Sequence, residues 1–267
     1  MTTRYPSVLT IAGSDSGGCA GIQADIKSIS ACGGYAASVI TATTAQNTLG
    51  VTDIHPIPLS HLEKQLDAVL SDIEFGAVKI GMLHSCDVIE LVAAKLSEYR
   101  ARNIVLDPVM VATSGDRLIA ESAVNCLKKF LPASLLITPN LKEAEILMGR
   151  SIHSESLQES TKEIGKHYQT SVLLKGGHLE GLDDQMVDTL YEAETGQITT
   201  ITNPRVETKN THGTGCSLSS SIATYLSLGF GLKDSVRKGC QYTNQAILNG
   251  KDRVLGKGNG PINHFGL

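Results

Sequence analysis

The clearest candidate for a reactive site is segment 210–216, which reads NTHGTGC. Gly213 and Gly215 free the backbone to curl, and a Ser-rich apolar helix is predicted at about 216–228. The first turn of a helix offers unpaired N–H groups and the positive end of its dipole, which favour a phosphate anion. Cys216 lies in that turn, where the pKa of a thiol is expected to fall from about 8.5 toward neutrality. The alternative for Cys216 is a small side chain buried in a glycine-rich cap.

A second glycine-rich segment, 12–21, reads AGSDSGGCAG. It follows an apolar run at 8–12 and precedes a predicted helix at about 21–32. Such a loop lets the backbone approach a ligand and leaves amides free at the helix start. The segment lacks the GK[ST] ending of a P-loop and the glycine offsets of G-x-G-x-x-G. Ligand contact and an ordinary tight turn are therefore equally open for it.

Charged and amide side chains follow three further apolar runs. Asp107 directly follows one run, Asn140 and Glu143 follow the next, and Lys175 follows a third. Taken alone, Glu143 would only complement the dipole of a helix in its first turn. In open α/β sheets, however, the carboxyl ends of the strands meet at one edge, where ligands bind. Carboxylates, a lysine and two glycine-rich helix starts on one edge form the constellation that phosphoryl transfer requires.

The elements that must position these groups alternate between strand and helix. Short continuous apolar runs are typical of strands buried on both faces, and helix-length segments between them imply parallel pairing. Thr195-Gly196 separates two β-rich stretches, which predicts an antiparallel hairpin over 185–202. A helix is predicted over 60–71, with Ser60 as its cap and Glu63 completing a capping box. The further predicted strands are 8–12, 37–45, 78–82, 104–106, 135–137 and 172–174, and the further predicted helices are 21–32, 87–99, 121–130, 216–228 and 232–249.

Length and composition indicate the class of protein. A chain of 267 residues corresponds to one or two domains, and the lack of a linker or repeat favours a single domain over 1–267. Hydrophobic residues make up 41% and charged residues 19%, as in ordinary globular proteins. A net charge of −4, 4% aromatic residues and no Trp give no basis for binding nucleic acid.

The same reading predicts a cytoplasmic setting. The apolar run 8–12 is too short for a signal sequence, and no run approaches the roughly 18 residues of a membrane span. The six cysteines are scattered and form no C-x-x-C pair. In a chain of this length that pattern predicts reduced thiols.

In this order the motifs resemble the ribokinase-like superfamily, and more closely the hydroxymethylpyrimidine/phosphomethylpyrimidine kinase family of thiamine biosynthesis. The resemblance runs from residue 9 to residue 219, with a further match near the C-terminus. The motifs that carry it are LTIAGSDSGG at 9–18, AGIQADIK at 20–27, SVITATTAQNTLGV at 38–51, KIGML at 79–83, LDPVM at 106–110, LITPNLKEAE at 136–145, LLKGGH at 173–178, TKNTHGTGCSLS at 208–219 and GKGNGP at 256–261.

This resemblance implies a ribokinase-like three-layer α/β/α sandwich with a mostly parallel central sheet and a small antiparallel edge hairpin. It implies two successive phosphorylations with MgATP as the donor. The first converts 4-amino-5-hydroxymethyl-2-methylpyrimidine to its monophosphate, and the second converts the monophosphate to the diphosphate. The resemblance also implies a homodimer, the common state of relatives.

By position, the resemblance also assigns the site residues. Gln46 suits the pyrimidine pocket, because an amide offers both a donor and an acceptor to an aminopyrimidine edge. Cys216 stands where sugar kinases of the superfamily carry an aspartate base, after a turn that supplies the anion hole. The assigned residues are Gly13, Asp25, Gln46, Met82 and Val109 for the substrate, Asn140, Lys175 and His212 for ATP, Glu143 and Asp107 for Mg²⁺, and Gly213, Thr214, Gly215 and Cys216 for catalysis.

Three details stay open within this resemblance. Cys19 stands where many relatives have glycine, and is either a small side chain facing the helix or a second thiol near the substrate. His212 either contacts phosphate or holds its loop through a structural tautomer. The lid over the site is expected at 114–116 or at 178–184, two polar stretches that suit a mobile loop.

Two alternative functions are weighed against the pyrimidine kinase. A pyridoxal or pyridoxine kinase has the same fold, but Gln46 within TAQN favours the pyrimidine. A non-catalytic ligand-binding module belongs to a different class, and loss of catalysis would be expected to remove one of the residues Asn140, Glu143 and Lys175 or part of the 213–216 turn.

Overall fold

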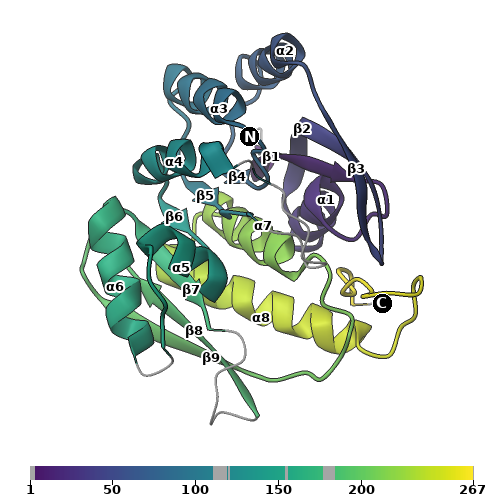
Figure 1. Cartoon of the computed structure of the whole chain (residues 1–267), viewed down its shortest axis with the longest axis vertical. Helices are drawn as coiled ribbons and strands as arrows, with labels where there is room; N and C mark the ends of the chain where they lie inside the picture. The colour runs from purple at the N-terminus through teal and green to yellow at the C-terminus, as the bar shows by residue number, and fades with distance from the viewer. Residues whose placement is uncertain (1–3, 111–118, 120, 154–155, 177–183, 267) are drawn as a thin grey trace.

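A computed structural model of the chain describes residues 4–110, 119, 121–153, 156–176 and 184–266. The described strands form one sheet in the order β3-β2-β1-β4-β5-β6-β7-β8-β9 (Figure 1). Its centre, from β2 to β7, is parallel, while β3 pairs antiparallel with β2 at one edge and β8 and β9 are antiparallel at the other. The strands are β1 (Ser7–Asp15), β2 (Tyr35–Asn47), β3 (Gly50–Pro56), β4 (Ala77–Ile80), β5 (Ile104–Leu106), β6 (Leu136–Ile137), β7 (Ser171–Lys175), β8 (Gln185–Tyr191) and β9 (Ile198–Pro204).

Helices cover both faces of this sheet, because successive side chains of a strand point to opposite sides. In β1, Leu9 and Ile11 pack into the core beneath helices α2 to α6, whereas Val8 packs into the core beneath α1, α7 and α8. The result is the predicted three-layer α/β/α sandwich. The helices are α1 (Gly21–Ala31), α2 (Leu59–Leu70), α3 (Cys86–Glu98), α4 (Glu121–Phe130), α5 (Leu141–Met148), α6 (Leu157–Tyr168), α7 (Thr214–Ser227) and α8 (Leu232–Gly250), with a short 3-10 turn at Leu131–Ala133.

The edges and helix starts differ from the sequence prediction in specific places. The predicted hairpin over 185–202 is confirmed as β8 and β9, but the antiparallel strand β3 at the opposite edge was not predicted. None of the residues of β3 is buried, so it lacks the apolar run that identifies a core strand. The Ser60 cap is wrong: α2 begins at Leu59 after the extended residue Pro58, which places Ser60 inside the helix.

The expectation that all six cysteines are reduced thiols is also wrong. Cys86, the first residue of α3, forms a disulfide with Cys126 on α4, a pairing across 40 residues of sequence that spacing alone does not reveal. The other four cysteines are free. No described helix combines the length and apolar character that crossing a membrane requires.

Candidate active site

A cavity of about 760 Å³ opens at the carboxyl edge of the parallel strands, as expected for an open α/β sheet. It gathers residues that follow the ends of β1, β4, β5, β6 and β7, together with the start of α7. Of the predicted site residues, all but Asp25 line it. Those that line it are Gly13, Gln46, Met82, Asp107, Val109, Asn140, Glu143, Lys175, His212, Gly213, Thr214, Gly215 and Cys216.

The start of α7 requires glycine at position 213 and brings a second glycine, Gly215, close to charged side chains. Gly213 precedes the helix with φ +82°, a left-handed conformation, and a Cβ there would collide with the carbonyl oxygen of Cys19. A Cβ at Gly215 would lie 3.3 Å from Asp107 Oδ2 and 3.4 Å from Lys175 Nζ. The backbone therefore approaches both the first glycine-rich loop and the charged groups of the cavity, with the amides of a helix start facing the space between them.

Three charged side chains meet beside that helix start. Lys175 Nζ donates to Asp107 Oδ1 at 3.1 Å and lies 4.0 Å from Glu143 Oε2. Thr138 Oγ1 donates to the same Asp107 oxygen at 3.1 Å. Asn140 and Glu143 cap α5 reciprocally: Asn140 Oδ1 accepts from the Glu143 amide at 2.9 Å, and Glu143 Oε2 accepts from the Asn140 amide at 2.8 Å.

Burial and the neighbouring charges shift the pKa values of this cluster. Burial raises the pKa of Glu143 to about 7, against the opposing effect of Lys175 and with a further upward contribution from Asp107. Burial would lower the pKa of Lys175, but the two carboxylates outweigh it and raise the value to about 12. Carboxylate oxygens are the ligands that Mg²⁺ prefers, so the donor set of Asp107 and Glu143 fits the ion that the resemblance implies.

Cys216 is the largest departure from the predicted electrostatics. Burial raises the pKa of its thiol to about 11, although Lys79 and the amide of Gly21 act in the opposite direction. Asp25 and Asp107 add to the upward shift. The predicted fall of the Cys216 pKa toward neutrality is therefore wrong, because the helix start does not compensate for removing the thiolate from water.

Beneath Cys216 lies a buried ion pair that the sequence analysis did not identify. Lys79 Nζ lies 2.7 Å from Asp25 Oδ1 and 2.8 Å from Oδ2, and both side chains are fully buried. Ser220 Oγ donates to Asp25 Oδ1 at 2.7 Å, and Thr10 Oγ1 donates to Oδ2 at 2.6 Å. Asp25 thus joins β1, β4, α1 and α7 and does not line the cavity. A lysine within the otherwise apolar strand AVKI was the available signal, since a buried charge needs a partner.

Gln46, which also lines the cavity, reaches His212. Gln46 Nε2 lies 3.1 Å from His212 Nε2, and Gln46 Oε1 accepts from Thr44 Oγ1 at 3.0 Å. The pairing of β2 with β3 is irregular at Gln46: Ala45 pairs with Asp53 and Gln46 with Val51, so one extra residue of β3 forms a bulge beside Gln46. Met82 packs against Gly13 nearby, where a Cβ would meet the methionine methyl group.

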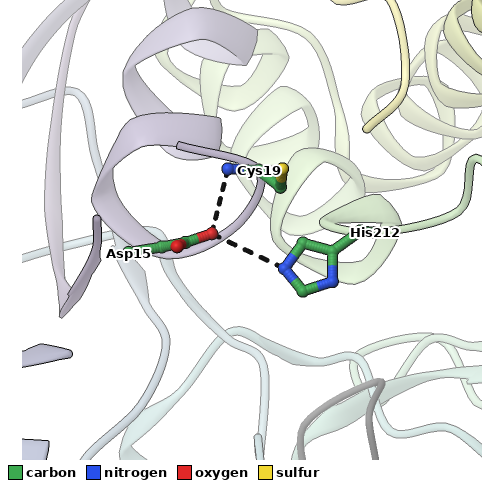
Figure 2. A group of neighbouring side chains, drawn as sticks. All are labelled: Asp15, Cys19 and His212. Carbon is green, nitrogen blue, oxygen red and sulfur yellow. Dashed lines mark hydrogen bonds and ion pairs between the residues drawn. The ribbon is translucent and has the colours of Figure 1, made fainter. Parts of the chain in front are cut away.

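Asp15 is a further residue that the sequence analysis missed. Its carboxylate accepts from the amides of Gly17, Cys19 and Ala20 at 2.8–2.9 Å and faces His212 Nε2 at 3.5 Å (Figure 2). Burial would raise the pKa of Asp15, but the contact with His212 and the three amides lower it. An aspartate two residues before a pair of glycines was the sequence signal, because its carboxylate can organise the free amides of the loop.

The structure does not test the two segments expected to form a lid over the site. Residues 114–116 lie outside the described residues, and so does 178–184 apart from Asp184. Cys19, whose role the sequence also left open, is buried at 1% exposure and lies next to Asp15 and His212.

Comparison with known proteins gives concordant matches over nearly the whole chain. A family model described as phosphomethylpyrimidine kinase matches residues 15–263. The chain is 48% identical to the thiamine biosynthesis bifunctional protein ThiED of Geobacter sulfurreducens over 97% of its own length, but spans only 52% of that protein. It is 44% identical to the hydroxymethylpyrimidine/phosphomethylpyrimidine kinase of Rhizobium meliloti, with 96% of each chain covered.

Solved structures of two kinase types resemble the chain. The phosphomethylpyrimidine kinase of Clostridium difficile matches with a TM-score of 0.78 and 39% identity, over 90% of this chain and 99% of that one. The ADP complex of Bacillus subtilis pyridoxal kinase matches with a TM-score of 0.88 and 30% identity, over 98% of each chain. The backbone thus resembles both types, whereas the sequence identity is higher for the pyrimidine kinase.

Proposed function

Because the chain belongs to the phosphomethylpyrimidine kinase family, we propose that it is a phosphotransferase that acts twice on one pyrimidine. In the first reaction ATP phosphorylates 4-amino-5-hydroxymethyl-2-methylpyrimidine, and in the second ATP phosphorylates the resulting monophosphate to the diphosphate. These are the two phosphorylations of that pyrimidine in thiamine diphosphate biosynthesis. The observation that carries the proposal is the cavity that the start of α7, Lys175, Cys216 and Gln46 line together.

The charged end of the cavity suits the phosphates of ATP. Phosphoryl transfer passes through a loose transition state, so positioning and charge stabilisation dominate catalysis. Lys175 offers a fixed positive charge, and the amides after Gly213 offer an anion hole at a helix start. When bound, Mg²⁺ supplies positive charge that neutralises phosphate oxygens, and Asp107 and Glu143 are the residues that would hold it.

The proton of the substrate hydroxyl needs an acceptor only in the first reaction. The alcohol oxygen attacks the γ-phosphorus of ATP, the bond to ADP breaks, and the hydroxyl proton passes to the thiolate form of Cys216. In the second reaction the nucleophile is a phosphate oxygen, which is already ionised at neutral pH because its second pKa is about 6. Cys216 is thus proposed as a base for the alcohol and as a spectator for the monophosphate.

Gln46 is proposed to select the pyrimidine. Its amide can donate to a ring nitrogen and accept from the exocyclic amine, a pair of contacts that a pyridoxal ring does not offer in the same pattern. The sequence identity to a pyrimidine kinase also exceeds that to a pyridoxal kinase. A vitamin B6 kinase is the competing function to be tested, because the backbone also resembles that of a pyridoxal kinase.

A substrate panel followed by phosphorus NMR tests the proposal directly. The purified chain is incubated with MgATP and, in separate reactions, the pyrimidine alcohol, its monophosphate, pyridoxal and pyridoxine. We expect a monophosphate and then a diphosphate from the pyrimidine, and a lower kcat/KM for either B6 vitamer. Turnover of pyridoxal without turnover of either pyrimidine would refute the proposal, and absence of any turnover together with no ATP binding in calorimetry would favour a non-catalytic module.

A further inference from the structure

Asp15, Cys19 and His212 form a cluster of three chemically different metal-ligating side chains. Their ligand atoms all lie within 4.8 Å of one another, and all three residues are buried, at 3%, 1% and 5% exposure. Figure 2 shows the Asp15 carboxylate facing the His212 ring, with Cys19 on the turn that leads into α1. Nothing in the proposed phosphoryl transfer uses Cys19 or explains why a carboxylate and an imidazole face each other here.

The ring of His212 lies between an amide and a carboxylate. Gln46 Nε2 lies 3.1 Å from His212 Nε2, and Asp15 Oδ2 lies 3.5 Å from the same nitrogen. A cation placed between His212 and Asp15 would be bound by an imidazole nitrogen and a carboxylate oxygen together.

Distances in the cluster suit a tetrahedral ion. Ligand bonds of about 2.0–2.3 Å place neighbouring ligand atoms about 3.3–3.8 Å apart in a tetrahedral zinc site. The 3.5 Å between Asp15 Oδ2 and His212 Nε2 already falls in that range. Cys19 Sγ lies within 4.8 Å of a ligand atom of each of the other two residues and makes a 3.7 Å contact with the carbonyl oxygen of Gly17, so modest side-chain movement would bring all three to the spacing of a metal site.

The hydrogen bonds of Asp15 and the entry path also fit. Three backbone amides hold the Asp15 carboxylate in place: Gly17 donates to Oδ1, and Cys19 and Ala20 donate to Oδ2, so the acceptor position that remains for a further ligand is on Oδ1. Asp15 and His212 line the cavity, so an ion from solvent can reach them. Thiolate and imidazole ligands select a borderline-soft ion such as Zn²⁺ over Mg²⁺, which prefers oxygen ligands alone.

We propose that Asp15, Cys19 and His212 form a binding site for Zn²⁺ or a similar soft divalent cation, separate from the carboxylates assigned to Mg²⁺. The Cys19 thiol gives up its proton to the buffer when the ion binds. An ion on His212 Nε2 would displace the Gln46 contact and so alter the pyrimidine end of the cavity. That consequence rests on the proposed function, whereas the binding itself does not.

The test measures metal binding without ATP or substrate, so its outcome is independent of the proposed function. The full chain carries Cys86→Ser and Cys126→Ser in every sample, because these thiols and Glu90 form a second potential ligand group when reduced. Zn²⁺ affinity is measured by competition with a chromogenic chelator. Co²⁺ serves as a spectroscopic probe, since only a thiolate ligand produces a sulfur-to-cobalt charge-transfer band.

We expect one equivalent of Co²⁺ to produce the thiolate band. Cys19→Ala should abolish the band and weaken Zn²⁺ binding by at least about tenfold, a loss that even outer partners of metal sites can cause. His212→Ala should weaken Zn²⁺ binding as well, while Cys216→Ala, which removes another thiol of the same cavity, should leave both readouts unchanged. Thermal unfolding checks that each variant is folded. A band that persists in Cys19→Ala, disappears in Cys216→Ala, or never forms would overturn the proposal.

Discussion

The role proposed for Cys216 predicts that its removal separates the two phosphorylations. A general base contributes typically about 10²–10⁴-fold to a reaction that must remove a proton. We expect Cys216→Ala to lower kcat for the pyrimidine alcohol by that factor. For the monophosphate, whose attacking oxygen is already ionised, we expect a change below about threefold. Separate initial-rate assays with each substrate, followed by ADP release, measure the two effects.

The raised pKa of Cys216 adds a quantitative pH dependence. With a pKa of about 11, about one thiol in 10⁴ is ionised at pH 7 and about one in 10² at pH 9, because the ionised fraction changes tenfold per pH unit. The first reaction should therefore accelerate by up to about 100-fold between pH 7 and pH 9. The second reaction should be nearly flat over the same range.

Cys32→Ala is the matched control. Cys32 caps the end of α1 outside the cavity, and burial raises the pKa of its thiol to about 11 as well. Its removal should leave both rates and their pH dependence unchanged. Equal losses in the two reactions for Cys216→Ala, or a first reaction that does not respond to pH, would refute the assignment of Cys216 as a base for the alcohol.

Three further predictions follow from buried charges and the disulfide. Asp25→Asn leaves Lys79 buried without its charged partner, so we expect the free energy of unfolding to fall by about 3–5 kcal/mol. At about 2–4 °C per kcal/mol, Tm should fall by roughly 6–20 °C. An unchanged Tm with a raised KM for the pyrimidine would instead place Asp25 in the substrate site. Because the pKa of Glu143 is raised from 4.5 to about 7, its protonation stabilises the fold below pH 4.5, and this contribution is lost as the pH rises through 7. In urea unfolding, the free energy of unfolding of the unmodified chain should be lower at pH 8 than at pH 5, and the difference should be smaller in Glu143→Gln. Equal differences in the two proteins would contradict this prediction. Replacing both Cys86 and Cys126 with Ser should lower the free energy of unfolding by about 2–4 kcal/mol. A reductant should lower it by a similar amount in the unmodified chain and should not change it in the variant.

Sequence patterns were sufficient to predict an element or site residue where its local signal agreed with its surroundings in the folded chain. Short apolar runs located the parallel strands, and glycines or charges directly after those runs located the cavity, because strand ends converge whatever the details of packing. The same logic failed for β3, which has no buried apolar residue, and for α6. On α6 the buried face includes Ser160 and Thr161, so its apolar periodicity is weak.

Properties that depend on three-dimensional neighbours were not predictable. The pKa of Cys216 reflects how deeply α7 is buried, whereas the sequence reveals only that the residue lies at a helix start. Asp25 and Lys79 are 54 residues apart, and only the three-dimensional structure, in which Asp25 of α1 meets Lys79 of β4, shows that they neutralise each other. The Cys86–Cys126 bond depends on the approach of α3 and α4, which sequence spacing does not encode.

The reciprocal cap of α5 has a consequence for ligand binding. Glu143 both closes the first turn of this helix and faces Lys175 in the cavity. A bound cation that draws Glu143 Oε2 away from the Asn140 amide releases the helix end, at a cost of about 1 kcal/mol for a lost cap. By thermodynamic reciprocity, binding of the ligand then makes local opening of the α5 end roughly five times more favourable, and opening of that end raises the ligand affinity by the same factor. Amide hydrogen exchange in the first turn of α5 would report occupancy of the cavity from outside it.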